Sequence, residues 1–285
     1  MFQVVCFAVT PTKSRGANLS TRRRVGSYPF WAYANLTVSS FKRLEPKTRA
    51  LLLTVKKAKV PKGLLFDKVR RSENTTGESR GLMMDELVGW LDFVKSDLFD
   101  RPTVLIDPDL LYQSNLMAAF QVSFDIGLTW RDVSDAPDPV DFSQTANRQP
   151  YNAGVIFLSP ERKDRVIRFF ETCLSELMSM EEKYWGWFGD QEAIINAAGR
   201  QGHLDFEPQV WEHGGVKFQS FPSDIYNYSQ PWEPSGQYQL THFPLPSIIH
   251  FKGMRAKLMF RYAKEFLNMR FQPDRRSPGG MKIVL

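Results

Sequence analysis

The sequence predicts an α/β domain with a mostly parallel central sheet flanked by helices. Short runs of β-branched and apolar residues alternate with longer runs whose apolar residues recur at helical spacing, which is the pattern of this fold class. The first run, Val4–Thr10, is almost continuously apolar, as expected of a strand that is buried on both faces. We find no internal repeat, so we expect one domain over residues 1–270 and a flexible basic tail over 271–285.

The first half of the chain supplies most of the expected strands. A helix is expected over Leu82–Lys95, because apolar residues such as Leu87 and Trp90 recur along one helical face. The polar, glycine-containing segment 71–81 is expected to be a loop. In chain order, the other expected elements are a strand at Val4–Thr10, a helix at Trp31–Leu44, strands at Leu51–Val55, Leu64–Val69 and Pro102–Ile106, a short helix at Leu111–Phe120 and a strand at Phe124–Thr129.

The second half is expected to contain a long loop, helices and short strands. Segment 132–150 is rich in Asp and Pro, which indicates a long loop. Ser159 and Pro160 suit the N-cap and the first position of a helix that continues to Leu177. The remaining expected elements are a strand at Val155–Leu158, a helix at Asp190–Ala198, a strand at Val216–Phe218 and a closing helix at Ala256–Leu267.

Composition limits the classes of function. The 285 residues are 42% hydrophobic and 13% aromatic, which supplies a sizeable core and excludes a disordered chain. No apolar run reaches the roughly 18 residues that span a bilayer, and the opening lacks the basic region of a signal peptide. Because Cys6 and Cys173 are the only cysteines, we predict a reducing, cytoplasmic location rather than a disulfide scaffold.

The net charge is +6, from 37 basic and 31 acidic residues, and it favours anionic partners. Much of the excess lies in residues 13–24 and in the C-terminal PDRRSPGGMK. No zinc-finger spacing or RNA-binding signature accompanies these stretches, so we expect solvated loops rather than a nucleic-acid surface. The amphipathic, basic stretch 257–276 leaves peripheral membrane contact open, beside the simpler interpretation of a docked helix.

Two acids follow the expected strand Pro102–Ile106 directly, as Asp107-Pro108-Asp109. At the carboxyl end of a strand, both carboxylates would lie at the edge where open α/β sheets bind ligands. Carboxylate oxygens suit hard divalent cations, and such an ion can bridge to a diphosphate. Asp and Pro also favour surface turns, so the motif alone leaves both interpretations open.

A second apolar run, in PSIIHFKG at 246–253, ends in His250, Lys252 and Gly253. A neutral imidazole suits a Mn²⁺-like ion, and a lysine can neutralise a phosphate. A glycine beside them lets backbone N–H groups approach an anion. The alternative is a partly buried structural histidine.

Amide side chains stand at two further element boundaries. Asn152 precedes the strand at Val155–Leu158, and Gly154 removes a side chain where another group comes close. Asp190 and Gln191 fall in the first turn of the next expected helix. An ordinary strand entrance and a helix cap explain these residues equally well when each motif is taken alone.

Taken together, the motifs resemble those of the GT-A nucleotide-sugar glycosyltransferases, in particular the family that includes glycogenin and the bacterial lipopolysaccharide galactosyltransferases. The resemblance covers most of residues 1–260 and implies a GT-A, Rossmann-like fold. The segment FPSDIYNY at 221–228 is a further similarity. The matching features are a first strand at Val4–Thr10, Asp107-Pro108-Asp109, Tyr151-Asn152-Ala153-Gly154, Gly189-Asp190-Gln191 and His250-Phe251-Lys252-Gly253.

The resemblance also implies roles for individual residues. Asp107, Asp109 and His250 would bind Mn²⁺ or Mg²⁺, and Asp107 would also reach the ribose of a UDP-sugar donor. Lys252 and Gly253 would hold its diphosphate. The residues implied to contact the nucleoside or another part of the donor are Phe7, Ala8, Thr10 and Arg80. Those implied to lie at the reacting sugar, with catalytic roles, are Asn152, Asp190 and Gln191.

The chain departs from the family pattern after the histidine motif. The family has a Lys six residues after its His, whereas this chain has Ala256 there, between Arg255 and Lys257, and lacks the Pro-Trp that follows. One of the two basic residues would have to replace that phosphate contact. The segment 11–30 is also longer and more basic than is typical of the family, and Glu192 replaces the second acid of its Asp-Gln-Asp triplet.

The main hypothesis is a metal-dependent glycosyltransferase that moves a sugar from a UDP-linked donor to a glycan, lipid-linked or protein acceptor. The resemblance implies retention of anomeric configuration, although Asp190 could also be the base of an inverting enzyme. One alternative is a sugar nucleotidyltransferase, which needs a glycine-rich loop, yet the first fifteen residues after Thr10 contain one glycine. The other alternative is a non-catalytic protein on a degenerate transferase fold that binds RNA or another polyanion.

Overall fold

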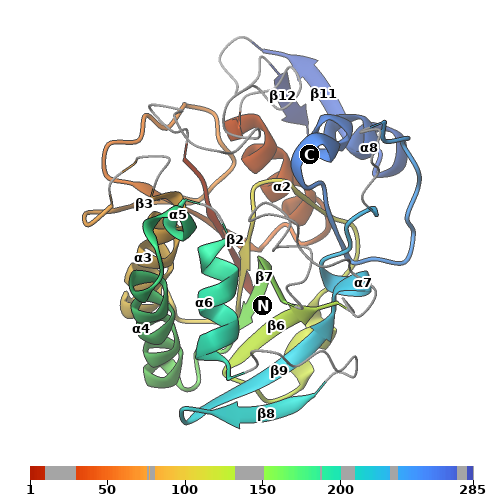
Figure 1. Cartoon of the computed structure of the whole chain (residues 1–285). Coiled ribbons are helices and arrows are strands. Elements are labelled where there is room, and N and C mark those ends of the chain that lie inside the picture. Colours follow the sequence, from red (N-terminus) through yellow and green to blue (C-terminus); the bar gives the residue numbers. More distant parts are fainter. Residues whose placement is uncertain are drawn as a thin grey trace.

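An eight-stranded sheet runs through the centre of the protein, and helices cover both of its faces (Figure 1). The computed structural model describes residues 1–9, 30–75, 77, 81–131, 151–186, 188–199, 209–231, 237–274 and 281–284. The strand order across the sheet is β3-β2-β1-β4-β7-β6-β9-β8. The strands of this sheet are β1 (Gln3–Phe7), β2 (Arg49–Val55), β3 (Lys68–Ser72), β4 (Thr103–Ile106), β6 (Ile126–Trp130), β7 (Tyr151–Leu158), β8 (Val210–His213) and β9 (Val216–Pro222).

The predicted α/β class with a mostly parallel sheet is confirmed. β3, β2, β1 and β4 pair in parallel, and β6 pairs with β9 in parallel. β7 is antiparallel to both of its neighbours, and β8 is antiparallel to β9. Within the described sheet, β7 and β8 alone oppose the common direction, so the carboxyl ends of the other strands share one edge.

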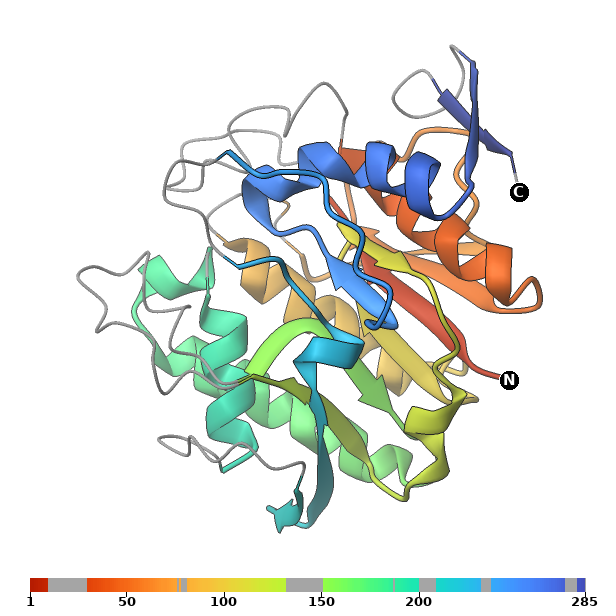
Figure 2. The same cartoon turned by 90° about the vertical axis from the view of Figure 1, so that its right-hand side faces the viewer.

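The helices form one layer on each face of the sheet (Figure 1, Figure 2). One layer consists of α3 (Leu82–Lys95), α4 (Lys163–Ser179), α5 (Glu182–Trp185) and α6 (Gly189–Ala197). The opposite face is covered by α2 (Phe30–Leu44), with α8 (Met259–Phe266) beside it, and the short α7 (Ser223–Tyr226) follows β9. Successive side chains of β1 enter opposite layers of core: Val5 packs under α3 and α4, whereas Val4 packs under α2.

Two small antiparallel ladders lie outside the central sheet. β5 (Leu110–Tyr112) pairs with β10 (Ile248–His250), and β11 (Arg270–Pro273) pairs with β12 (Met281–Val284). Residues 271–285 were expected to form a flexible tail, but residues 271–273 lie in β11 and residues 281–284 form β12. Apolar contacts anchor these strands, because Ile283 is buried and Phe271 packs on Phe260 of α8, with ring centroids 5.5 Å apart.

The helix expected at Leu111–Phe120 is wrong. β5 occupies its beginning, because β10 supplies hydrogen-bond partners for this backbone, and a 3₁₀ turn, η2 (Met117–Gln121), follows. The third strand begins later than expected and continues to Ser72, inside the expected loop. It is an edge strand, and its exposed residues are mainly basic, so its apolar pattern is weak.

Ser159 does not cap the helix that follows β7. Its N–H donates to the carbonyl of Asp125 (3.1 Å), so strand pairing continues through this residue. α4 begins only at Lys163, with Arg162 at the N-cap. α3 has the predicted bounds, and β8 was not predicted.

The apolar side chains of the stretch 257–276 pack inward. Met259 is fully buried, and Phe260 packs on Tyr33 of α2, with ring centroids 5.8 Å apart. This packing supports the docked helix over membrane contact. Across the described ranges, no helix combines the length and the apolar character that crossing a membrane requires. Cys6 and Cys173 are buried free thiols.

Candidate active site

Asp107 and Asp109 lie in the turn after β4, at the predicted edge of the sheet. Pairing with β7 continues into this turn, because Asp107 N–H donates to the carbonyl of Gly154 (3.0 Å). The buried Thr37 hydroxyl of α2 donates to the Pro108 carbonyl (2.6 Å) from the other side. The turn is thus held on both sides, while its carboxylates remain 30% exposed for Asp107 and 21% exposed for Asp109.

The β5–β10 ladder brings His250 to these two aspartates. His250 pairs with Leu110, and Phe251 N–H donates to the carbonyl of Asp109 (2.9 Å). His250 Nε2 consequently lies 3.0 Å from Asp109 Oδ1 and 3.4 Å from Asp107 Oδ2. The three potential ligand atoms lie within 4.8 Å of one another. Two carboxylates and an imidazole converging in this way fit a divalent cation such as Mn²⁺.

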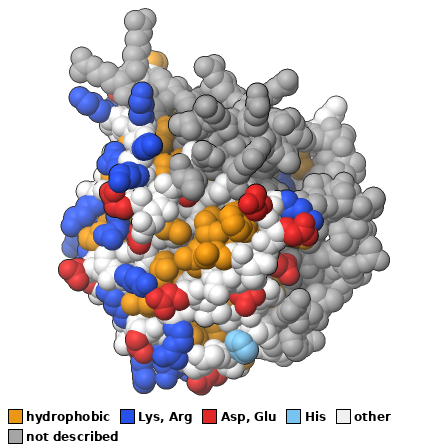
Figure 3. Space-filling model, turned by 60° about the vertical axis from the view of Figure 1, so that its left-hand side comes forward, with side chains coloured by type: hydrophobic (Ala, Val, Ile, Leu, Met, Phe, Trp, Pro, Cys, Tyr) orange, Lys and Arg blue, Asp and Glu red, His pale blue; other side chains and the backbone are white. Residues whose placement is uncertain are grey.

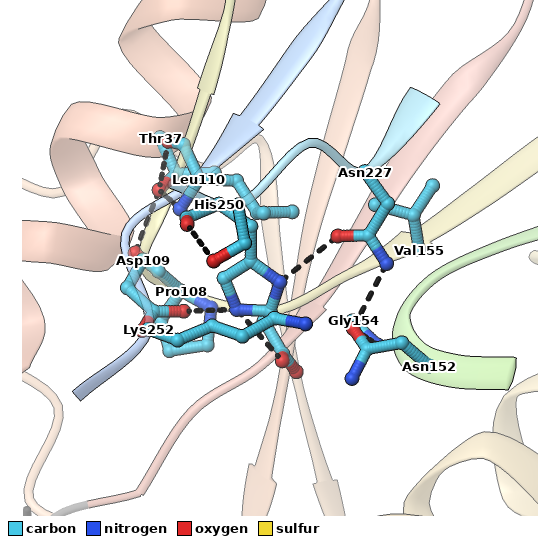
Figure 4. A network of polar contacts seen from close by, with 12 residues as sticks. Thr37, Pro108, Asp109, Leu110, Asn152, Gly154, Val155, Asn227, His250 and Lys252 are labelled. Atoms are coloured by element: carbon cyan, nitrogen blue, oxygen red, sulfur yellow. Dashed lines mark hydrogen bonds and ion pairs between the residues drawn. The ribbon is translucent and has the colours of Figure 1, made fainter. Parts of the chain in front are cut away.

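An amide network joins His250 to the residues of two other motifs (Figure 4). Asn227, directly after α7, lies with its Oδ1 2.9 Å from His250 Nδ1 and donates through Nδ2 to Asn152 Oδ1 (2.8 Å). Asn152 in turn donates through Nδ2 to Gln191 Oε1. The fold therefore brings together three residues that the sequence placed in separate motifs, and Asn227 links them.

Gly154 is the point where the imidazole ring approaches the sheet. A Cβ at this position would lie 2.4 Å from His250 Cε1 and 2.7 Å from its Nδ1. The close approach expected at this glycine is thus made by a side chain of the protein itself. A larger residue here would displace the ring.

The entry to α6 is strained. Phe188 has a φ of 64°, a left-handed conformation that is rare and costly for a bulky residue. Gly189 must follow, because a Cβ there would lie 2.3 Å from the carbonyl oxygen of Tyr184. This entry positions the first helical turn, in which Asp190 and Gln191 are 6% and 7% exposed.

Three cationic side chains lie in this part of the site: the charges of Asp107 and Asp109 act on Lys252 and that of Asp109 on Arg255, whereas Arg131 lies near these two cations. Lys252 follows β10, Arg131 follows β6, and Arg255 lies in the 3₁₀ helix η4 (Gly253–Leu258). Burial, followed by the charge of Arg131, lowers the pKa of Lys252 to about 7, and Arg255 acts in the same direction. The charge of Asp107 opposes this shift. A positive cluster and a negative cluster therefore share the site.

Arg255 directly precedes Ala256, the position at which the family that the sequence resembles has a lysine. Its Nε donates to the carbonyl of Lys252 (3.0 Å), and its Nη1 donates to the Ser229 hydroxyl (3.0 Å). Its guanidinium also lies over the Tyr238 ring, 5.3 Å from the centroid. Lys257 is exposed. Of the two basic residues beside Ala256, Arg255 is the one held near the site.

The electrostatics of the site favour a cation between the carboxylates. Burial, followed by the charge of Asp109, raises the pKa of Asp107 to about 8. Burial lowers the pKa of His250 to about 4, so its ring is neutral at ordinary pH. A proton or a metal ion would relieve the repulsion between the carboxylates, and the two would compete for the site.

Glu86 is a residue of this neighbourhood that the sequence analysis missed. It lies in α3 and is 7% exposed. Burial, followed by the charges of Asp107 and Asp190, raises its pKa, and burial raises the pKa of Asp190 to about 6. The available signal was an acid four residues before Trp90, within the apolar stripe of the helix. Arg131 was also missed, although it lies two residues after the expected strand Phe124–Thr129.

The structure describes some, but not all, of the other residues that were predicted to contact the nucleotide-sugar donor. Phe7 and Ala8 lie at the end of β1, 4% and 1% exposed, and pack in the cores under α3 and α2 respectively. Gly253 has a φ of 60°, which glycine adopts readily. Thr10 and Arg80 lie outside the described residues, as do the predicted loops at 13–24 and 132–150. The roles of these residues stay predictions.

Replacing Asp107 with Asn should stabilise the metal-free protein, and the gain should grow as the pH rises from about 4 to about 8. Folding raises the pKa of this carboxyl to about 8, so the folded protein holds a proton that the unfolded chain has released. The stability contributed by the proton is complete below the unfolded pKa and is lost as the pH approaches about 8. Thermal unfolding with a chelator should show an advantage of several degrees at about pH 8 and a smaller one at about pH 5. An advantage that is equal at both pH values would contradict this assignment.

No family model matches the sequence, and no curated protein is significantly similar to it. Among solved structures, the chain is similar to a glycosyltransferase involved in glycosylation of the major capsid of PBCV-1, with a TM-score of 0.49 and 10% identity over 91% of this chain and 98% of that chain. It is similar to the galactosyltransferase LgtC in complex with donor and acceptor sugar analogues, with a TM-score of 0.48 and 13% identity over 89% and 87% of the two chains. For mouse xyloside xylosyltransferase 1 the TM-score is 0.47, with 13% identity over 88% and 97%. At these identities the function has to be inferred from the side chains of the site.

Proposed function

We propose that this chain is a metal-dependent glycosyltransferase that transfers a sugar from a UDP-linked donor to an acceptor hydroxyl with retention of anomeric configuration. The main support is the pairing of opposite charges in one site. Asp107, Asp109 and His250 suit a divalent cation, and Lys252 beside them, together with the nearby Arg131, suits an anion. Side by side, the two clusters suit a cation that is bound together with a diphosphate, which is the charged part of a nucleotide sugar.

Different residues of this chain would bind the metal ion and neutralise the diphosphate leaving group. Asp107, Asp109 and His250 would hold Mn²⁺ or Mg²⁺, which acts as a Lewis acid toward the diphosphate oxygens when it is bound. Lys252 would neutralise the charge that develops on the diphosphate as the glycosyl–phosphate bond breaks. The backbone N–H groups around Gly253 would approach a phosphate from the side of η4.

Asn152, Asp190 and Gln191 would contact the transferred sugar. This sugar passes through an oxocarbenium-like state, which an amide oxygen or a carboxylate on its face can stabilise. The Gln191 amide cannot take the acceptor's proton as an inverting enzyme's base must, whereas the Asp190 carboxylate could. The anomeric configuration of the product, read from its NMR coupling constants, decides this point.

The polyanion-binding alternative has less support. On the face seen in Figure 3, acidic side chains lie among the basic ones, and hydrophobic side chains gather near the centre. Exposed lysines also pair with acids, as Lys56 does with Glu73 (2.6 Å). At the site, the charges of Asp107 and Asp109 act on Lys252, so this cation does not belong to a purely basic surface.

A thermal-shift panel of nucleotide sugars, with and without Mn²⁺, tests the proposal. A ligand that binds the folded state raises its stability, by about 2.7 kcal/mol at one hundred times its Kd. We expect UDP-sugars with Mn²⁺ to raise the Tm by several degrees, and ADP-sugars, GDP-sugars, and UDP-sugars without Mn²⁺ to have little effect. UMP with Mn²⁺ is the matched control, because it lacks the second phosphate.

Other outcomes of the panel support the alternatives. Stabilisation by RNA that falls steeply with salt and ignores Mn²⁺ would favour a polyanion-binding protein. Stabilisation by a nucleoside triphosphate, increased further by a sugar 1-phosphate, would favour a nucleotidyltransferase.

A further inference from the structure

The amide network at His250 has a fixed direction (Figure 4). The backbone N–H of Gly154 can only donate, and it donates to Asn152 Oδ1 (3.2 Å). Because this bond fixes the position of the Asn152 oxygen, the Asn227 atom 2.8 Å from it must be the Nδ2 donor. Asn227 Oδ1 then has to face His250 Nδ1, at 2.9 Å.

Thr129 supports the same orientation of the Asn227 amide. The Thr129 hydroxyl lies 3.2 Å from the carbonyl of Asn152 and 3.3 Å from that of Val155, and its single hydrogen is donated toward these acceptors. With that hydrogen so directed, its oxygen accepts from Asn227 Nδ2, 2.9 Å away. Asn227 is 2% exposed. A flipped amide would place its oxygen against the Asn152 oxygen, where water has little access to either atom.

A carbonyl oxygen at His250 Nδ1 requires a hydrogen on that nitrogen. On a neutral ring, Nε2 then carries the lone pair, which is directed toward Asp109 and Asp107. The opposite tautomer would instead donate Nε2–H to Asp109 Oδ1, which lies 3.0 Å away. In that tautomer Nε2 has no lone pair for a cation. The group facing Nδ1 therefore decides whether the ring can be a ligand.

We propose that Asn227 is a positioning residue, which holds His250 in the Nδ1–H tautomer that metal binding requires and, through Asn152, orients the Gln191 amide. At the far end of the network, Asn152 Nδ2 donates to Gln191 Oε1, so Gln191 Nε2 is turned away from Asn152. The Asn227 side chain thus determines both the tautomer of His250 and the orientation of the Gln191 amide. The role given to Gln191 rests on the proposed function, whereas the tautomer is a property of the protein alone.

The ring ¹⁵N chemical shifts of His250 in the metal-free protein test the tautomer directly, with the resonances assigned by comparison with a His250→Asn variant. We expect a hydrogen on Nδ1 and none on Nε2 in the wild type. In Asn227→Leu we expect the hydrogen to move to Nε2. Mn²⁺ binding, measured by EPR with Mn²⁺ alone, should weaken about 10- to 100-fold, as is usual when a ligating histidine loses its outer partner.

Asn227→Asp is the matched variant. A carboxylate keeps an acceptor at Nδ1, so we expect the wild-type tautomer and nearly wild-type Mn²⁺ affinity. It has no donor for Asn152, so we expect donor turnover to fall although the metal binds. This separation of metal binding from turnover is not expected of a residue that only stabilises the fold.

Wild-type His250 with its hydrogen on Nε2, or on both nitrogens, would overturn the proposal. An unchanged tautomer in Asn227→Leu would overturn it too, as would a lower Tm in both variants without any change in the ring shifts. If Asn227→Leu does not fold, the wild-type and Asn227→Asp spectra still decide. If the tautomer is as expected and no UDP-sugar stabilises the wild type, the proposed function fails while the positioning role of Asn227 stands.

Discussion

Replacing Asp109 with Asn is expected to reduce kcat/KM for donor turnover at least about a thousandfold. The Asp109 carboxylate lies 3.0 Å from His250 Nε2, and asparagine keeps its shape while removing its charge. A thousandfold loss corresponds to about 4 kcal/mol of transition-state stabilisation, which is within what a bound metal ion supplies. Initial rates of UDP-sugar hydrolysis at saturating Mn²⁺ measure the effect.

Asp97→Asn is the matched control for this variant. Asp97 is exposed and lies between α3 and β4, at the opposite edge of the sheet. The same chemical change there should leave the rate unchanged. Asp97→Asn should unfold close to the wild-type Tm, and Asp109→Asn should unfold no lower, because it removes a charge that repels Asp107. Wild-type turnover in Asp109→Asn would remove both the metal site and the transferase assignment.

Replacing Gly154 with Ala is expected to weaken Mn²⁺ binding at least about 100-fold. The added methyl group would lie 2.4 Å from His250 Cε1, so the ring has to move. That movement changes the distance from Nε2 to Asp109 and breaks the hydrogen bond to Asn227, and each of these contacts supports metal binding. We also expect the Tm to fall by several degrees, because the site is already closely packed. EPR titration with Mn²⁺ and thermal unfolding measure the two effects separately.

Gly127→Ala controls for the loss of stability. A Cβ at Gly127 would lie 2.5 Å from Phe221 Cε2 and 2.9 Å from Phe157 Cβ, which is a clash of similar severity within the core. This variant should lose Tm while it keeps its Mn²⁺ affinity. If the two variants lose Mn²⁺ affinity in proportion to their Tm, Gly154 acts through the fold rather than through the ring of His250.

The residues of the candidate metal site could be singled out from the sequence because they stand at strand ends, and the family resemblance placed them together. Asp107 and Asp109 directly follow the apolar run of β4, and His250 closes the apolar run of β10, so each is visible within one short segment. The apolar residues that predict α3 also lie within one segment, and the helix has the predicted bounds. For α3 the segment that contains the pattern also contains the whole element, and the prediction was correct.

The residues that the sequence did not reveal depend on distant partners. The backbone of β5 was interpreted as helix, because only pairing with β10 makes it a strand. Asn227 lies in the segment 221–228 that resembles the family, but the sequence gives it no role, because that role comes from contacts with His250 and Asn152. The burial of Glu86 likewise follows from the packing of α3 over the site rather than from its residue type. Such roles are set by tertiary packing.

β10 is the last strand of the site to leave the ribosome. All eight strands of the central sheet precede it in the sequence, so a nascent chain can fold that sheet while β10 is still inside the exit tunnel. At that stage β5 has no partner, and Asp107 and Asp109 have no imidazole beside them. The sheet can therefore form before the candidate metal site is complete, and this site forms only after β10 has left the exit tunnel.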